Sequence, residues 1–216
     1  MRSPNYEGEH QKALRANAAA IPKLLKAGDD NLLEKVTNFA ARFGFDLKDV
    51  LKKVEKDVMF AAHFAVSPSR QNIYENIAAQ HIGTLPNVKN FQKLPTGALS
   101  VSQGAVMSRA ELARHGGRSG AKTVDFTWEV GKTRVYASHK YTKEEGGAQD
   151  NQYQDLQQFI KEARDSSLKS TVFIAIADGP YYKGRRLKNL KSLANGRNVF
   201  ALSIDELPGL LKKFST

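Results

Sequence analysis

The sequence predicts an α/β (α+β) fold in which a mixed central sheet is flanked by helices and preceded by an N-terminal helical region. Apolar residues recur at helical spacing through the first 66 residues. Residues 124–141 alternate apolar and polar side chains around a Gly-Lys pair, which is typical of a β-hairpin. The apolar run TVFIAIA, residues 171–177, lies between helical segments, which is typical of a buried strand in a mixed sheet.

Three helices are predicted at the N-terminus, over residues 9–28, 29–44 and 46–66. Asp29 or Asp30 can cap the second helix, and Gly44 suits its end. The third helix carries a lysine-rich face that is either a solvated surface or a DNA contact. We expect residues 1–66 to form a helical region for dimerisation or for clasping DNA, and the sequence favours neither role.

The remaining chain, residues 67–216, is predicted to be a catalytic domain. A helix is expected over residues 67–86, and surface loops with short strands over 85–121, where Gly, Pro and Ser are frequent. The elements expected after the hairpin are a helix over 150–166, a strand over 170–178, a basic linker over 180–198, a strand over 199–204 and a helix over 205–215.

Composition narrows the class of protein. The 216 residues include 33 Lys and Arg against 22 Asp and Glu, a formal charge of +11, which favours a polyanionic partner. No cysteine is present, which excludes thiol catalysis and thiolate metal sites. No apolar run reaches the roughly 18 residues of a membrane span, and no secretory signal is evident, so we expect a cytoplasmic protein without membrane contact. No Walker loop or dinucleotide fingerprint occurs, so no nucleotide cofactor is expected.

The hairpin concentrates polar residues on one face. With Gly131 and Lys132 as the turn, Asp125 faces Ser138, and Lys140 follows Ser138 on the same face because side chains alternate. The apolar side chains of both strands point to the opposite face, so the three polar side chains converge at one end of the hairpin. On geometry alone, Asp125 and Lys140 are equally consistent with an ordinary surface ion pair.

Two other polar residues of the hairpin have simpler explanations. Glu129 faces Arg134 near the turn, which predicts a cross-strand ion pair. His139 alternates to the apolar face, so we expect a core or rim histidine rather than a catalytic base. The five histidines show no zinc-site spacing.

The segment DFTWEVGKTRVYASHKY followed by TKEEGGAQDNQYQDLQQFI resembles the PD-(D/E)xK nuclease superfamily, in particular the bacterial type II restriction endonucleases. Asp125 matches the first acid of the family pattern, and Lys140 matches its lysine. The predicted order of helix, hairpin, helix and strand across residues 68–178 also fits the family core. The resemblance implies a hydrolase that cleaves DNA.

One position departs from the family pattern. Ser138 stands where the family usually has Asp or Glu, and a hydroxyl cannot supply the second negative charge for a divalent cation. Glu75, on the preceding helix, is similar to the glutamate that a helix contributes in many such nucleases. Glu129 is the reserve candidate, and an exposed helix residue is the simpler interpretation of Glu75.

The resemblance implies Mg²⁺ as the cofactor, with a role for each residue of the site. Asp125 and Glu75 would bind the ion, with the main-chain carbonyl of His139 as a third ligand. Lys140 would orient the attacking water and stabilise the negative charge of the transition state. Ser138 would hold a water molecule bound to the metal.

The expected partner is double-stranded DNA, cut at a specific short sequence by a homodimeric type II restriction endonuclease. A structure-directed repair or recombination nuclease, and an inactive DNA-binding protein on the same scaffold, are the alternatives. Basic residues of two segments are the candidate DNA contacts: Arg109, Arg114, Arg118, Lys122, Arg185, Arg186 and Arg197.

Overall fold

The computed structural model describes residues 3–117, 120–143, 147–194 and 196–215. The chain forms two compact units. The helical unit is Asn5–Ile77, and the sheet unit is Met1–Pro4 with Ala78–Thr216. The division falls inside one helix, between Ile77 and Ala78, whereas the sequence suggested a boundary between residues 66 and 67. We describe each unit by itself.

The helical unit is built from short amphipathic helices around its own core. The helices are α1 (Tyr6–Lys26), α2 (Asp30–Phe43), α3 (Leu47–Lys56), α4 (Val58–Ala61), η1 (Ala62–Phe64), η2 (Pro68–Gln71) and the first part of α5 (Ile73–Gly83). Val36, Val54 and Ala61 are fully buried at the centre of this core.

Local capping determines where these helices begin and end. The Asp29 carboxylate accepts the Leu32 N–H at 2.8 Å, and Gly44 ends α2 in the left-handed conformation. The third predicted helix is not continuous over 46–66. Asp57 interrupts it, because its side chain accepts the N–H groups of Met59 and Phe60 and so starts a new helix, α4.

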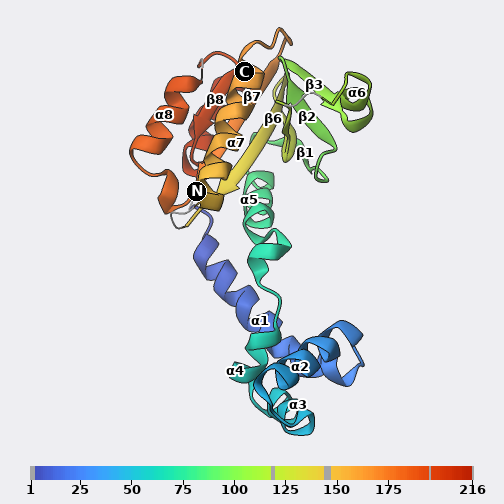
Figure 1. Ribbon diagram of the computed structural model, residues 1–216. Helices are drawn as coiled ribbons and strands as arrows, with labels where there is room; N and C mark the ends of the chain where they lie inside the picture. Colours follow the sequence, from blue (N-terminus) through green and yellow to red (C-terminus); the bar gives the residue numbers. More distant parts are fainter. Residues whose placement is uncertain (1–2, 118–119, 144–146, 195, 216) are drawn as a thin grey trace. The chain divides into compact units, whose positions relative to one another are not determined.

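The sheet unit contains a five-stranded mixed sheet within the described residues, in the order β1-β5-β6-β7-β8 (Figure 1). Its strands are β1 (Lys89–Lys93), β5 (Phe126–Val130), β6 (Thr133–Tyr141), β7 (Thr171–Asp178) and β8 (Val199–Leu202). The pairs β1–β5 and β5–β6 are antiparallel, whereas β6–β7 and β7–β8 are parallel. The predicted fold class is therefore confirmed.

Helices cover this sheet and extend the unit. They are α6 (Arg109–Arg114), α7 (Gly147–Arg164), η3 (Pro180–Tyr182), α8 (Arg185–Leu193), η4 (Ile204–Glu206), α9 (Leu207–Leu211) and η5 (Lys212–Phe214). Buried side chains of α7 and α8, including Phe159 and Leu190, share one core with Phe173 of β7. On the other face, the Phe91 ring of β1 contacts the rings of Phe126 and Trp128.

Two regions are more ordered than the sequence suggested. Residues 85–121 do not form only surface loops, because β2 (Leu99–Ser102) pairs with β3 (Ala105–Ser108) and β4 (Lys122–Thr123) in a second sheet. Val101 of β2 is fully buried. The predicted basic linker contains η3 and α8, since Leu190 gives α8 an apolar side that packs into the core.

Candidate active site

The hairpin has the predicted register. Val130 faces Thr133, and Glu129 faces Arg134. At the far end, the Ser138 hydroxyl donates to Asp125 Oδ2 at 3.1 Å. The structure therefore brings Asp125 and Ser138 together as predicted.

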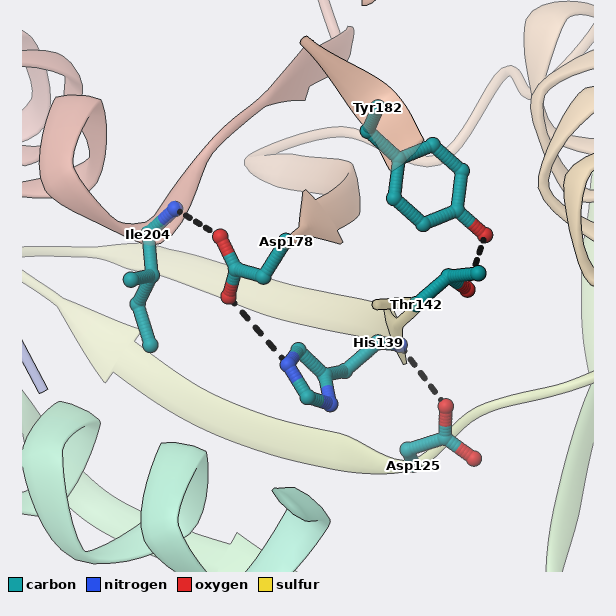
Figure 2. A network of polar contacts seen from close by, with 6 residues as sticks. All are labelled: Asp125, His139, Thr142, Asp178, Tyr182 and Ile204. Carbon is teal, nitrogen blue, oxygen red and sulfur yellow. Dashed lines mark hydrogen bonds and ion pairs between the residues drawn. The ribbon is translucent and has the colours of Figure 1, made fainter. Parts of the chain in front are cut away.

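Asp125 is held at the point where the chain enters β5. Its N–H donates to the Ala137 carbonyl at 2.8 Å, and its own carbonyl accepts the Leu94 N–H at 2.9 Å. The carboxylate Oδ2 also accepts the His139 N–H at 2.8 Å (Figure 2). Among the hydrogen bonds of the described residues, both side-chain contacts fall on Oδ2, which leaves Oδ1 for a ligand.

A row of polar side chains continues from Ser138 along β6. Lys140 is half-buried and lies two residues further on, so it shares the Ser138 face. Beyond the strand, the Thr142 hydroxyl donates to Gln152 Oε1 of α7 at 2.8 Å. Thr142 Oγ1 also lies 3.4 Å from the hydroxyl of Tyr182, and burial raises the pKa of Tyr182 to about 12.

Thr142 and Gln152 are polar neighbours of the site that were not predicted from the sequence. The spacing of Ser138, Lys140 and Thr142 follows the strand period of two, so alternation could have identified Thr142. No local signal identifies Gln152, because its position depends on how α7 packs against the sheet.

The opposite face of the sheet carries a buried His–Asp pair. The His139 Nε2 atom lies 3.2 Å from Asp178 Oδ2, and the two side chains are 2% and 5% exposed. Asp178 Oδ1 accepts the N–H of Ile204 at 2.9 Å (Figure 2). The expectation of a core histidine is confirmed, whereas Asp178 was not recognised from the sequence.

Glu129 and Glu75, the two candidates for a second carboxylate that binds the metal ion, lie in different parts of the structure. Glu129 forms the predicted ion pair with Arg134 at 2.5 Å and also accepts the Asn90 amide at 2.6 Å. It lies beside the hairpin turn, four residues from Asp125, so its reserve role as a metal ligand is wrong. Glu75 lies half-buried on α5, within the helical unit, and its role as a ligand stays a prediction.

The described residues contain no cluster of three or more His, Asp or Glu side chains that could hold a metal ion. Mg²⁺ nevertheless needs only one or two carboxylates when water and phosphate supply the remaining oxygens. The free Oδ1 of Asp125 and the neighbouring Ser138 hydroxyl are hard oxygen donors of the kind it prefers. The site therefore fits a largely hydrated Mg²⁺, which Asp125 would hold, and the His139 carbonyl remains a predicted third ligand.

Two of the predicted DNA contacts lie at the carboxyl end of the parallel strands, where β6 also carries Lys140. Arg185 is exposed at the start of α8. The Arg186 guanidinium lies 4.1 Å from the centre of the Tyr181 ring. Burial, together with a hydrogen bond to Asp150, raises the pKa of the Tyr181 hydroxyl.

The other predicted contacts do not join one surface with these arginines. Arg109 and Arg114 are exposed on α6, which lies far from α8 across the sheet unit (Figure 1). Lys122 is paired with Asp155 at 2.6 Å, and Arg197 precedes β8 at the amino end of the parallel strands. Arg118 lies outside the described residues. The six described residues therefore lie on separate parts of the sheet unit, and their roles as DNA contacts stay predictions.

No protein-family model and no curated protein matches the chain. Among solved structures, it is similar to Can2 from Sulfobacillus thermosulfidooxidans in complex with cyclic tetra-adenylate, at 11% identity and a TM-score of 0.37. It is also similar to protein VC1899 from Vibrio cholerae, at 12% identity and a TM-score of 0.31. Each match covers 99% of this chain and 57% of the other, so the chain spans just over half of their length.

None of the helices in the described part of the chain combines the length and apolar character needed to cross a membrane.

Proposed function

We propose that this protein is a Mg²⁺-dependent nuclease whose centre comprises Asp125, Ser138 and Lys140. The observation that carries the proposal is the position of these side chains on one face, at the end of a hairpin whose opposite face is buried. The Ser138 hydroxyl and the His139 main-chain N–H orient the Asp125 carboxylate. Lys140 lies two residues after Ser138, on the same face of the strand. The resemblance of this segment to PD-(D/E)xK nucleases supports the same assignment.

Each residue has a chemical role in phosphodiester hydrolysis. Asp125 would hold the ion through its carboxylate, and Ser138 keeps that carboxylate in one orientation. The Lys140 ammonium would lie beside the scissile phosphate and stabilise the negative charge that develops there. Mg²⁺, when bound, supplies polarisation of the phosphate and a more acidic water.

Duplex DNA is the substrate that the charge distribution supports. Residues 5–77 contain 11 Lys and Arg and 10 Asp and Glu, a net charge of +1, so the remaining chain carries +10 of the total +11. Excess positive charge on the sheet unit favours phosphate contacts. Arg185, exposed at the end of the sheet that carries Lys140, is the best-placed candidate contact.

The finer proposal is a type II restriction endonuclease that acts as a homodimer on a short palindromic site. Two-fold symmetry of the protein would match the symmetry of such a site. The supporting observation is the sequence resemblance around Asp125 and Lys140.

One observation favours a second candidate, a DNA-binding protein without nuclease activity. In the described part of the sheet unit, Asp125 is the single carboxylate beside Ser138 on the face that carries Lys140. Without a second charge from Glu75 or from the substrate, the affinity for Mg²⁺ could be too low for catalysis.

Digestion of a supercoiled plasmid with Mg²⁺, followed by sequencing of the ends, tests these proposals. Discrete fragments with a common end sequence support restriction, whereas cleavage confined to branched or damaged DNA supports a repair nuclease. Salt-sensitive binding without cleavage by wild-type protein would contradict the nuclease proposal and favour the DNA-binding protein. A Lys140→Ala variant that cleaves as fast as wild type would contradict the assigned centre.

A further inference from the structure

His139 connects the two faces of the sheet. Its main-chain N–H donates to Asp125 Oδ2 at 2.8 Å, on the side of the proposed centre. Its ring lies on the opposite side, with Nε2 3.2 Å from Asp178 Oδ2. A single residue therefore contacts both carboxylates, one through its backbone and one through its side chain (Figure 2).

The buried end of this connection is firmly held. Asp178 is 4% exposed, and its second oxygen accepts the Ile204 N–H at 2.9 Å. The Asp178 carbonyl also accepts the N–H of Thr142, the residue whose hydroxyl contacts Gln152. Asp178 thus binds the β6 segment both before and after Lys140, and a buried polar network of this kind tolerates little displacement.

The position of Asp125 makes this connection important. Val124 N–H donates to the Leu99 carbonyl of β2, so the chain pairs with β6 only from Asp125 onward. The His139 N–H donates to the Asp125 carboxylate. The orientation of this carboxylate consequently depends on the position of the His139 peptide.

We propose that Asp178 is a positioning residue for the nuclease centre, acting through the His139 ring on the peptide N–H that orients Asp125. This inference rests on the proposed function. Asp178 lies on the face of the sheet opposite to the proposed centre, so its role there is indirect. Its effect is to hold β6 so that Asp125 and Lys140 keep their relative positions, and small displacements of such groups slow catalysis strongly.

Three variants separate positioning from general stability. Asp178→Ala removes the side-chain contacts with His139 and with the Ile204 N–H. His139→Phe keeps the peptide N–H and an aromatic ring but removes the contact with Asp178. Leu207→Ala is the matched control, because it shortens a fully buried apolar side chain of α9 and removes no polar contact of the pair.

Single-turnover cleavage of duplex DNA, at a temperature where all variants are folded, gives the first readout. Asp178→Ala and His139→Phe should each slow the chemical step by about 10- to 100-fold with unchanged DNA affinity. The double variant should be no slower than either single variant, because both break the same connection. Leu207→Ala should cleave at the wild-type rate. Additive effects, or equal slowing by Leu207→Ala, would overturn the proposal.

The NMR chemical shift of the His139 amide gives a second readout that needs no cleavage activity. It reports the hydrogen bond to Asp125 in the free protein, and Asp178→Ala should move it more than Leu207→Ala does. An unmoved amide would overturn the positioning role even if wild type cleaves DNA. If wild type fails to cleave, the nuclease proposal fails while the amide shift still decides whether Asp178 positions Asp125. Asp178→Asn, which retains one acceptor oxygen, replaces Asp178→Ala in both readouts if the alanine variant does not fold.

Discussion

At the scale of single residues, the orientation of Asp125 follows from where it stands in the chain. It lies directly before β5, where its N–H donates to Ala137 of β6 and its carbonyl accepts the N–H of Leu94, the residue after β1. Two donors from β6 then restrict its side chain. A carboxylate oriented in this way loses little conformational freedom when it binds a cation.

A pH dependence of stability is predicted at His81 of α5. Burial lowers the pKa of His81 below its usual 6.5, and this effect outweighs the raising influence of Asp205 and Asp178. The folded state therefore resists protonation, and stability present above pH 6.5 is lost as the pH falls below it. The urea concentration at the unfolding midpoint should decrease as the pH is lowered from 7.5 to 5.5. In His81→Gln this decrease should be smaller. An identical decrease in His81→Gln would contradict this assignment.

Strand alternation was sufficient to predict part of the site from the sequence. It placed Asp125 opposite Ser138 and turned His139 toward the core, because the hairpin turn at Gly131 fixes the register of both strands. It could not identify Asp178, since the pairing of β6 with β7 joins segments separated by an entire helix. The sequence therefore placed Asp178 at the end of an apolar strand, before a glycine, but assigned it no role in the site.

At the scale of secondary-structure elements, the turn after β7 is tightly constrained. Gly179 has φ of +98°, and a Cβ atom there would lie 2.3 Å from the Thr142 carbonyl oxygen. Gly179→Ala should therefore lower the free energy of unfolding by about 2–4 kcal/mol, as measured by urea denaturation.

Gly184, at the start of α8, is the matched control for this prediction. It also has positive φ, +69°, but a Cβ atom there would meet nothing within 4 Å. Gly184→Ala should cost less, about 1–2 kcal/mol, from backbone strain alone. Equal losses in the two variants would show that the close approach to Thr142 has no energetic effect.

Elements with weak local signals were the ones that sequence reasoning misjudged. The segment containing α8 is so rich in Lys and Arg that its few leucines gave little periodicity, yet Leu190 is fully buried. The strands β2 and β3 are only four residues each, too short for alternation to be distinguished from a loop. Their stability comes from packing, which a local pattern does not contain.

At the scale of the whole molecule, each compact unit has a separate hydrophobic core. Val54 is fully buried in the helical unit, and the single tryptophan, Trp128, is fully buried in the sheet unit. Val54→Ala should destabilise the helical unit by about 2 kcal/mol. Far-UV circular dichroism should then show an earlier loss of helix, while the Trp128 fluorescence transition stays unchanged.

Val135→Ala is the control for this separation of cores, because Val135 is fully buried in β6 beside Trp128. It should move the fluorescence transition. A shift of the Trp128 transition by Val54→Ala, equal to that by Val135→Ala, would mean that the two units unfold as one.

The cleavage rate of Asp125→Asn directly tests whether Asp125 belongs to a nuclease centre. The asparagine keeps the size of the side chain and one acceptor oxygen but removes the negative charge that would hold Mg²⁺. Duplex DNA cleavage in Mg²⁺ should fall by at least about 100-fold, while DNA binding without Mg²⁺ stays close to wild type. Cleavage by Asp125→Asn at the wild-type rate would contradict the account.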